Sequence, residues 1–181
     1  RSVVLAATLL GAVAVSAEPL PEGTSPAALA RRSLTALRIE PGQIRIDGVL
    51  DEAPWALAAV ADRFIQSVPD PGRESRLRTE VRVLHDEEAL YVGVRMFDPE
   101  PRGIRAMFGR RDDETVSDWV FVQIDSRHDR RSAFSFGVNP AGVQIDGVFF
   151  NDTESDTSWD GVWESAARID ETGWVAEFRI P

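Results

Sequence analysis

The sequence contains no cysteine, only two histidines and a single tyrosine. Without cysteine there can be no disulfide bond and no thiol catalysis, so the stability of the fold must come from its core. The histidines belong to no H-E-x-x-H motif and no Cys/His cluster, which argues against a zinc site. The G-x-S-x-G motif of serine hydrolases and the glycine-rich phosphate loop are also absent. These absences predict a protein that binds a ligand and does not act as an enzyme.

Positive charge is scarce as well. Twenty Lys and Arg stand against 30 Asp and Glu, which gives a formal net charge of −10. Nucleic-acid binding requires clustered basic residues, and an acidic surface repels anionic lipid headgroups. Nucleic acid is therefore not an expected partner. Hydrophobic residues make up 43% of the chain and charged residues 28%, as in an ordinary globular domain.

The first residues resemble the remnant of a secretory signal peptide. An apolar run from Val3 to Val15 is interrupted only by Thr8 and Gly11 and is followed by small residues. A membrane-spanning helix, the alternative, needs about 20 apolar residues. We therefore expect residues 1–17 to be cleaved after Ala17. This predicts an exported protein, located in the periplasm, in the outer membrane or outside the cell.

The remaining chain divides into two parts. Residues 18–42 form a linker and lead-in segment that begins with Pro, Gly, Glu and Ser. Residues 43–181 have the length and composition of one domain. The last predicted strand alternates polar and apolar residues up to Ile180, and the sequence then stops at Pro181 without a closing turn. We expect this domain to be truncated at its C-terminus, with further chain in the natural protein.

Alternating hydrophobicity predicts strands along most of this domain. Turn signals such as Asn139-Pro140-Ala141-Gly142 separate them. One short helix is expected where Asp51 acts as the N-cap and Pro54 occupies the first turn. The fold class is therefore mainly β, an antiparallel β-sandwich with one short helix. The predicted strands are 44–46, 79–84, 89–97, 118–125, 132–138, 143–150, 162–169 and 173–180.

The five tryptophans are candidates for ligand contacts, because an indole offers a flat apolar face and one hydrogen-bond donor. Trp55 and Trp174 have the spacing of core residues, and Trp119 lies out of phase with its apolar neighbours. Trp159 and Trp163 flank an acidic loop, and we expect them to form an exposed platform on which a sugar ring can stack. The alternative is that both belong to the core.

Two acidic clusters could bind calcium, which takes six to eight oxygen ligands. Solvated loops are the alternative, since neither cluster has the spacing of a calcium-binding loop. A glycosidase acid pair is a further alternative for Asp118, Asp125 and Asp146, although acids at strand ends commonly cap turns. The residues predicted as metal ligands are Asp112, Asp113, Asp152 and Asp156, and the ion would be a structural calcium.

Five segments resemble the family 9 carbohydrate-binding modules in order and spacing. They are IDGVLDEAPW (46–55), ALYVGVRMFDPEP (89–101), DWVFVQID (118–125), FGVNPAGVQID (136–146) and GWVAEFRIP (173–181). The resemblance implies a β-sandwich, often stabilised by calcium and often attached to a xylanase, that holds the end of a sugar chain between two Trp rings. Thr115 stands where the first of these Trp residues is found and Gly137 replaces an Arg, whereas Asn139 matches. The second Trp would lie beyond Pro181.

The chain is most similar to a subgroup found at the N-terminus of large exported bacterial proteins, which continue into a segment predicted to form an outer-membrane β-barrel. We expect a non-catalytic module that binds a polysaccharide or oligosaccharide of the xylan or cellulose class. A structural or gating domain that packs against a downstream barrel is the alternative. Any hydrolase activity would belong to another, downstream catalytic domain. The residues expected to bind the sugar are Trp159, Trp163, Asp118, Asn139 and Gln144.

Overall fold

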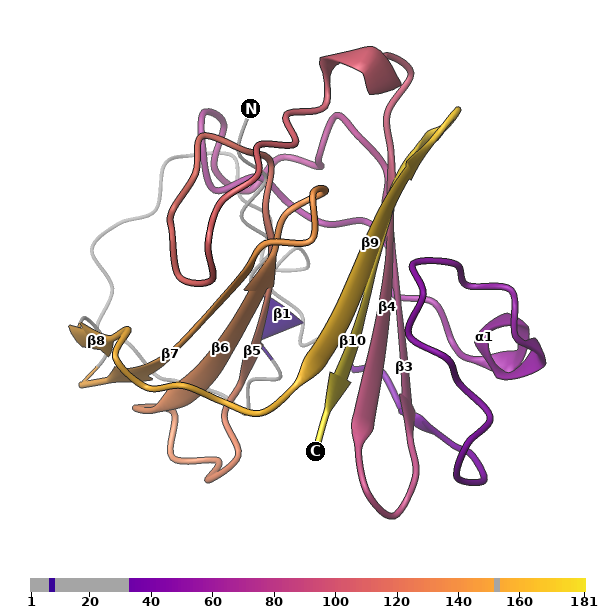
Figure 1. Cartoon of the computed structure of the whole chain (residues 1–181), viewed down its shortest axis with the longest axis vertical. Coiled ribbons are helices and arrows are strands. Elements are labelled where there is room, and N and C mark those ends of the chain that lie inside the picture. The colour runs from indigo at the N-terminus through magenta and orange to yellow at the C-terminus, as the bar shows by residue number, and fades with distance from the viewer. Residues whose placement is uncertain (1–6, 9–32, 152–153) are drawn as a thin grey trace.

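The computed structural model describes residues 7–8, 33–151 and 154–181. Two five-stranded sheets face each other across a hydrophobic core (Figure 1). We call them sheet A, with the order β1-β5-β6-β7-β8, and sheet B, with the order β2-β3-β4-β10-β9. Most pairings are antiparallel, and the short edge strands β1 and β2 pair in parallel. This confirms the predicted mainly-β sandwich.

Sheet B contains the longest strands. Alternating apolar residues form the hairpin of β3 (Thr79–His85) and β4 (Leu90–Phe97). The Asp86 Oδ1 atom closes this hairpin by accepting hydrogen bonds from the backbone N–H groups of Glu88 and Ala89, each at 2.8 Å. The other strands are β10 (Gly173–Ile180), which lies between β4 and β9, then β9 (Glu164–Asp170) and β2 (Leu37–Arg38).

Sheet A is built from four consecutive antiparallel strands and one parallel edge strand. The turn from Asn139 to Gly142 joins the strand that ends at Val138 to the strand that begins at Gln144, and Gly142 has a φ of +82°, which suits glycine. The strands are β5 (Val120–Ile124), β6 (Ala133–Val138), β7 (Gln144–Phe150), β8 (Glu154–Asp156) and β1 (Ala7–Thr8). Strand β1 falls in the segment predicted as a signal peptide. The rest of that segment lies outside the described residues, so its cleavage stays a prediction.

The core lies between the inner faces of the two sheets. Alternate residues of each strand enter it, as the period of two requires. The Trp163 ring stacks on Phe178 with centroids 5.8 Å apart and an interplanar angle of 10°. The other buried members are Val81, Val92, Val94, Met96, Val120, Val122, Phe136, Val138, Trp174, Ala176 and Ile180.

Helix α1 (Ala53–Leu57) covers the outer face of sheet B, on the right in Figure 1. Its Trp55 is 1% exposed and rests on Gly93 of β4, where a Cβ atom would come within 3.0 Å of the indole ring. The N-cap is Glu52, so the prediction of Asp51 as N-cap is wrong by one residue. The expected strand at 44–46 is also wrong, because this segment pairs with no neighbouring strand. No helix among the described residues is long and apolar enough to cross a membrane.

Candidate functional site

A pocket of about 220 Å³ opens at one end of the sandwich, at the top of Figure 1. Strand β4 ends here, whereas β3, β5 and β10 begin here. The connection that follows β4, which includes a 3₁₀ turn at Pro101–Gly103, forms one wall. We call this opening the end pocket. Its lining combines aromatic rings and charged groups, notably Phe97, Glu100, Arg105, Asp118, Trp119 and Trp174.

The backbone holds the polar lining in place. The Asp118 Oδ2 atom accepts a hydrogen bond from the Arg105 N–H at 3.0 Å, and the Arg105 carbonyl accepts one from the Asp118 N–H at 2.9 Å. The predicted sugar ligand Asp118 therefore lines the pocket in a fixed orientation.

The two Trp residues of the end pocket differ in their hydrogen bonding. The Trp119 indole donates to the Thr115 carbonyl at 3.1 Å, and its ring stacks on Phe121 with centroids 5.8 Å apart. The Trp174 indole N–H has no hydrogen-bond partner in the described part of the chain. Both rings are only 5% exposed, so a ligand would meet their edges. The Trp174 N–H is a donor that such a ligand could use.

Asn139, the residue that matches the family pattern, is 0% exposed. Its Nδ2 atom donates to the Met107 carbonyl at 2.9 Å and lies 3.2 Å from the Thr115 and Ser117 hydroxyls. Its Oδ1 atom accepts from the backbone N–H group of Ala141, within the turn, at 3.0 Å and from that of Val143, after the turn, at 2.9 Å. The amide is fully used within the protein. Its observed role is to anchor residues 105–118, which we call the 105–118 loop, to sheet A.

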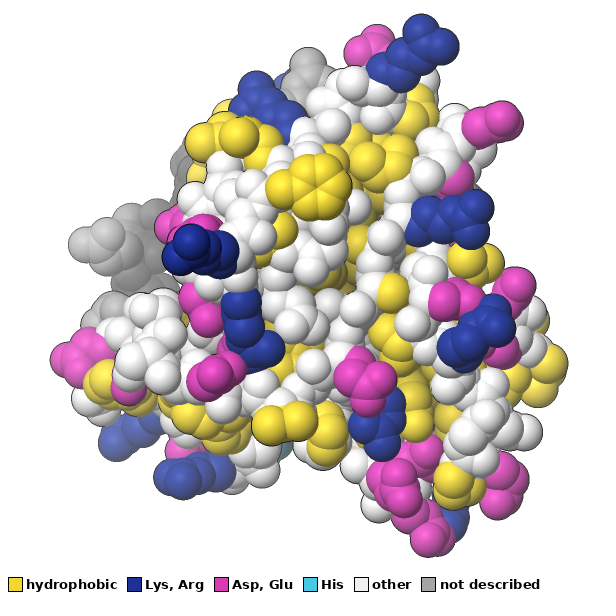
Figure 2. All heavy atoms as spheres, viewed as in Figure 1, with side chains coloured by type: hydrophobic (Ala, Val, Ile, Leu, Met, Phe, Trp, Pro, Cys, Tyr) yellow, Lys and Arg dark blue, Asp and Glu magenta, His cyan; other side chains and the backbone are white. Residues whose placement is uncertain are grey.

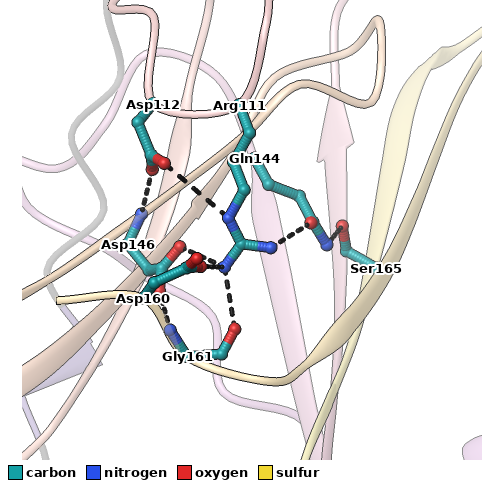
Figure 3. Close-up of polar contacts among 7 residues, drawn as sticks. All are labelled: Arg111, Asp112, Gln144, Asp146, Asp160, Gly161 and Ser165. Atoms are coloured by element: carbon teal, nitrogen blue, oxygen red, sulfur yellow. Dashed lines mark hydrogen bonds and ion pairs between the residues drawn. The ribbon is translucent and has the colours of Figure 1, made fainter. Parts of the chain in front are cut away.

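Arg111, near the middle of the same loop, provides a second anchor (Figure 3). Its Nη2 atom lies 2.6 Å from Asp146 Oδ1, 2.8 Å from Asp160 Oδ1 and 2.8 Å from the Gly161 carbonyl. The Asp146 side chain is fully buried and also accepts the Gly161 N–H at 2.5 Å. A buried carboxylate requires such pairing, so the group ties the loop to β7 and to the chain before β9. We call these residues, with Asp112, Gln144 and Ser165, the Arg111 cluster.

Gln144 belongs to this cluster and bridges the two sheets. Its Oε1 atom accepts from Arg111 Nη1 at 3.2 Å, and its Nε2 atom donates to the Ser165 hydroxyl on β9 at 3.0 Å (Figure 3). The predicted sugar ligand Gln144 therefore lies away from the lining of the end pocket. Its hydrogen bonds connect the edges of sheets A and B at this point.

The expected platform of Trp159 and Trp163 does not form as a pair. Trp163 is 6% exposed and lies in the core, so the prediction that it is exposed is wrong. The chain crosses from sheet A to sheet B at this point, which carries the ring between the sheets. Trp159 is half-buried, with its ring centroid 4.9 Å from that of Phe134, and it covers Gly161. Only Trp159 presents part of its ring to solvent.

The three described residues among the predicted metal ligands do not form a metal-binding group. Asp112 Oδ1 accepts the Asp146 N–H at 3.3 Å, and Asp113 Oδ2 accepts the Arg110 N–H at 3.0 Å. Hydrogen bonds from Ser158 lower the pKa of Asp156. Asp152 lies outside the described residues. Among the described residues, no three acidic, His or Cys side chains form a group that could hold a metal ion, and calcium stays a prediction.

Sequence reasoning missed Arg111, Arg105 and the pocket role of Trp174. Apart from the adjacent Asp112, the partners of Arg111 lie 33 to 50 residues further along the chain, so no local pattern indicates them. Trp174 has the alternation of a core residue, and it is one, but it is also the first large side chain of its strand. Its position at the strand end was the available signal.

The model of the carbohydrate family 9 binding domain-like family matches residues 46–181. Two solved structures of a family 9 carbohydrate-binding module from Caldicellulosiruptor kristjanssonii share the fold, one in complex with cellotriose and one with glucose. Both have a TM-score of 0.55 and 18% sequence identity, and the match covers 81% of this chain and 67% and 68% of those chains. A comparison with curated protein sequences finds no match. Because the family model covers most of the sequence, the chain belongs to the carbohydrate family 9 binding domain-like family.

Proposed function

We propose that this domain is a non-catalytic module that binds one end of a neutral oligosaccharide of the xylan or cellulose class in the end pocket. The observation that carries the proposal is the meeting of Trp119 and Trp174 with the Asp118 carboxylate in one opening. Sugar recognition needs apolar ring surface beside a few well-placed polar groups. Family membership and the cellotriose and glucose complexes of the similar fold support the same conclusion.

The size of the end pocket limits how much of a ligand can enter it. Its volume of about 220 Å³ is smaller than the ~300–1,000 Å³ of typical small-molecule sites. One sugar residue would therefore enter the pocket, and the rest of the oligosaccharide would remain outside. The Trp174 N–H would donate to a ring hydroxyl, and the Asp118 carboxylate would accept from another. The Arg105 and Glu100 side chains at the rim would contact the next residue.

A titration with cellotriose and xylotriose, followed by Trp fluorescence, tests the proposal. Asp118→Asn removes the charge but keeps an oxygen that can accept the Arg105 N–H. We expect it to weaken binding about tenfold, because a hydrogen bond to a charged group contributes about 1.5–3 kcal/mol. Asp113→Asn, which lies outside the pocket lining, is the matched control. Equal affinities for all three proteins would refute the end pocket as the site.

Catalysis is not part of the proposed role. Asp125 accepts the backbone N–H groups of Asp129 at 3.2 Å and Arg130 at 2.8 Å, as a turn-capping acid does. Asp146 is buried and paired with Arg111. Neither carboxylate lines the end pocket, where a sugar would be held. We propose that any glycoside hydrolase activity belongs to another domain of an exported protein.

One observation favours a second candidate function, the packing of this domain against another part of the same protein, such as a barrel. The 105–118 loop exposes Met107 (52%), Phe108 (85%) and Val116 (69%). Figure 2 shows hydrophobic side chains on the surface at the upper end of the sandwich, where Figure 1 places this loop. Hydrogen exchange in the full-length protein and in the isolated domain tests this role. Protection of the loop only in the full-length protein would support it, and equal exchange would contradict it.

A further inference from the structure

A second hollow lies on the outer face of sheet B, on the side of that sheet opposite the core. It has a volume of about 540 Å³ and lies between the segment that contains α1 and strands β4, β10 and β9. Apolar surface from Val49, Leu50 and Val175 is combined with charged side chains. We call this hollow the outer-face pocket. It shares no residue with the lining of the end pocket.

The register of sheet B explains why the pocket exists. One row across the sheet contains Gly93 opposite Glu177, and here Leu50 and Trp55 rest directly on the strands because Gly93 has no side chain. The neighbouring row contains Arg95, Val175 and Arg168, and it points to the same side. The segment around α1 stops short of this second row, so the hollow remains between them.

Three arginines line the outer-face pocket, and they differ in how they are paired. Arg95 forms a bidentate pair with Asp170 at 2.5 and 2.7 Å. Arg82 binds Glu80 through Nη1 at 3.0 Å. The Arg168 side chain has no ion pair or hydrogen bond among the described residues, although its Cβ lies against the turn at Gly48. The Arg168 guanidinium is therefore a planar, permanently charged fork without an anion.

Two buried polar atoms of the lining also lack partners in the part of the chain that the structure describes. Trp55 is 1% exposed, and its Nε1 atom has no hydrogen-bond partner there. The Glu52 Oε2 atom is likewise buried without a partner. Unpaired buried polar atoms are uncommon in folded proteins and call for an explanation. Both atoms are closed to solvent in this structure, so a hydroxyl group from outside the chain would reach them only after their side chains shift.

We propose that the outer-face pocket is a second binding site, and that it takes the uronic acid residue of an acidic saccharide. The carboxylate would pair with the Arg168 guanidinium, since this fork matches a carboxylate. The apolar side of the sugar ring would lie on Val175 and Leu50. A ring hydroxyl group would donate to the Asp51 carboxylate. That the ligand is a saccharide, and not another carboxylate, rests on the proposed function. That the ligand carries a negative charge rests on Arg168 alone.

Calorimetric titration of the full chain with trigalacturonate tests the proposal, with cellotriose and acetate as companion ligands. We expect trigalacturonate to bind, acetate to bind at least tenfold more weakly, and the affinity for trigalacturonate to fall with added salt. Arg168→Gln should weaken trigalacturonate at least tenfold, and Arg73→Gln, an exposed arginine outside the pocket, should not. Equal affinity of wild type and the Arg168 variant overturns the site. Equal affinity for acetate and trigalacturonate overturns the proposal that the site recognises a saccharide.

The proposal for the end pocket and the proposal for the outer-face pocket can be refuted independently of each other. If the end pocket binds neutral sugar, Asp118→Asn weakens cellotriose and leaves trigalacturonate unchanged, and Arg168→Gln does the reverse. If cellotriose does not bind and trigalacturonate binds in an Arg168-dependent way, the proposed function fails and the outer-face site stands. Loss of trigalacturonate binding in the Asp118 variant alone places the acid in the end pocket and overturns the outer-face site.

Discussion

Glu177 makes the stability of this fold depend on pH. Its side chain is 0% exposed on the outer face of sheet B. The Oε2 atom accepts three backbone N–H groups, from Asp47 at 3.0 Å, Gly48 at 2.6 Å and Val49 at 3.2 Å. Burial is the largest influence and raises the pKa of Glu177 from 4.5 to about 7, helped by the charges of Glu52 and Asp47 and opposed by the backbone N–H groups.

The direction of the effect follows from proton linkage. Because the folded protein binds this proton more tightly than the unfolded chain does, the contribution of Glu177 to stability is complete below about pH 4.5 and is lost as the pH rises through about 7. A difference of that size corresponds to about 3 kcal/mol. Glu177→Gln keeps an oxygen acceptor for the three N–H groups and cannot ionise.

Urea denaturation between pH 5 and pH 8 measures the effect. We expect the free energy of unfolding of the wild type to fall by up to about 3 kcal/mol relative to the Glu177→Gln variant across this range. Glu171→Gln, at an exposed position in the turn between β9 and β10, is the control and should follow the wild type. Parallel pH profiles for wild type and Glu177→Gln would refute the reasoning.

Two further predictions concern packing and pairing. Arg111→Met leaves a buried carboxylate without its cation and should lower the free energy of unfolding by up to about 3 kcal/mol, whereas Arg110→Met, at the exposed neighbouring position, should have little effect. Gly93→Ala places a Cβ atom 2.7 Å from Leu50 and should cost about 1–3 kcal/mol, whereas Gly103→Ala, with nothing within 4 Å, should not destabilise. Urea denaturation measures all four variants, and equal values within either pair would contradict that prediction.

The fold could be predicted because its determinants are local. The hairpins of β3 with β4 and β9 with β10 follow from alternation within a few residues and from the turns between them. An apolar face after Pro54 predicts the helix, although the predicted N-cap is one residue too early. The segment 44–46 has the same alternation, yet Ile44 and Ile46 pack against the cluster around Trp55 and the segment joins no ladder.

The site could be predicted only in part, because its geometry depends on distant residues. Asn139 and Arg111 have polar side chains beside turns, which indicates exposure, but partners more than 20 residues away bury or engage them. Trp163 has acidic neighbours in the sequence and is nevertheless in the core, since the chain crosses there between the sheets. Asp118 was identified because it begins a strand, and strand ends surround the end pocket.

The indole N–H signals of the five tryptophans test the central claim most directly, because Trp119 and Trp174 line the end pocket and Trp55, Trp159 and Trp163 lie outside it. The measurement is a titration of the ¹⁵N-labelled protein with cellotriose, followed by NMR. If the end pocket binds the sugar, the Trp174 and Trp119 signals shift in a saturable way and those of Trp55 and Trp163 do not. Shifts confined to Trp159, or no shift at any cellotriose concentration, would contradict the account.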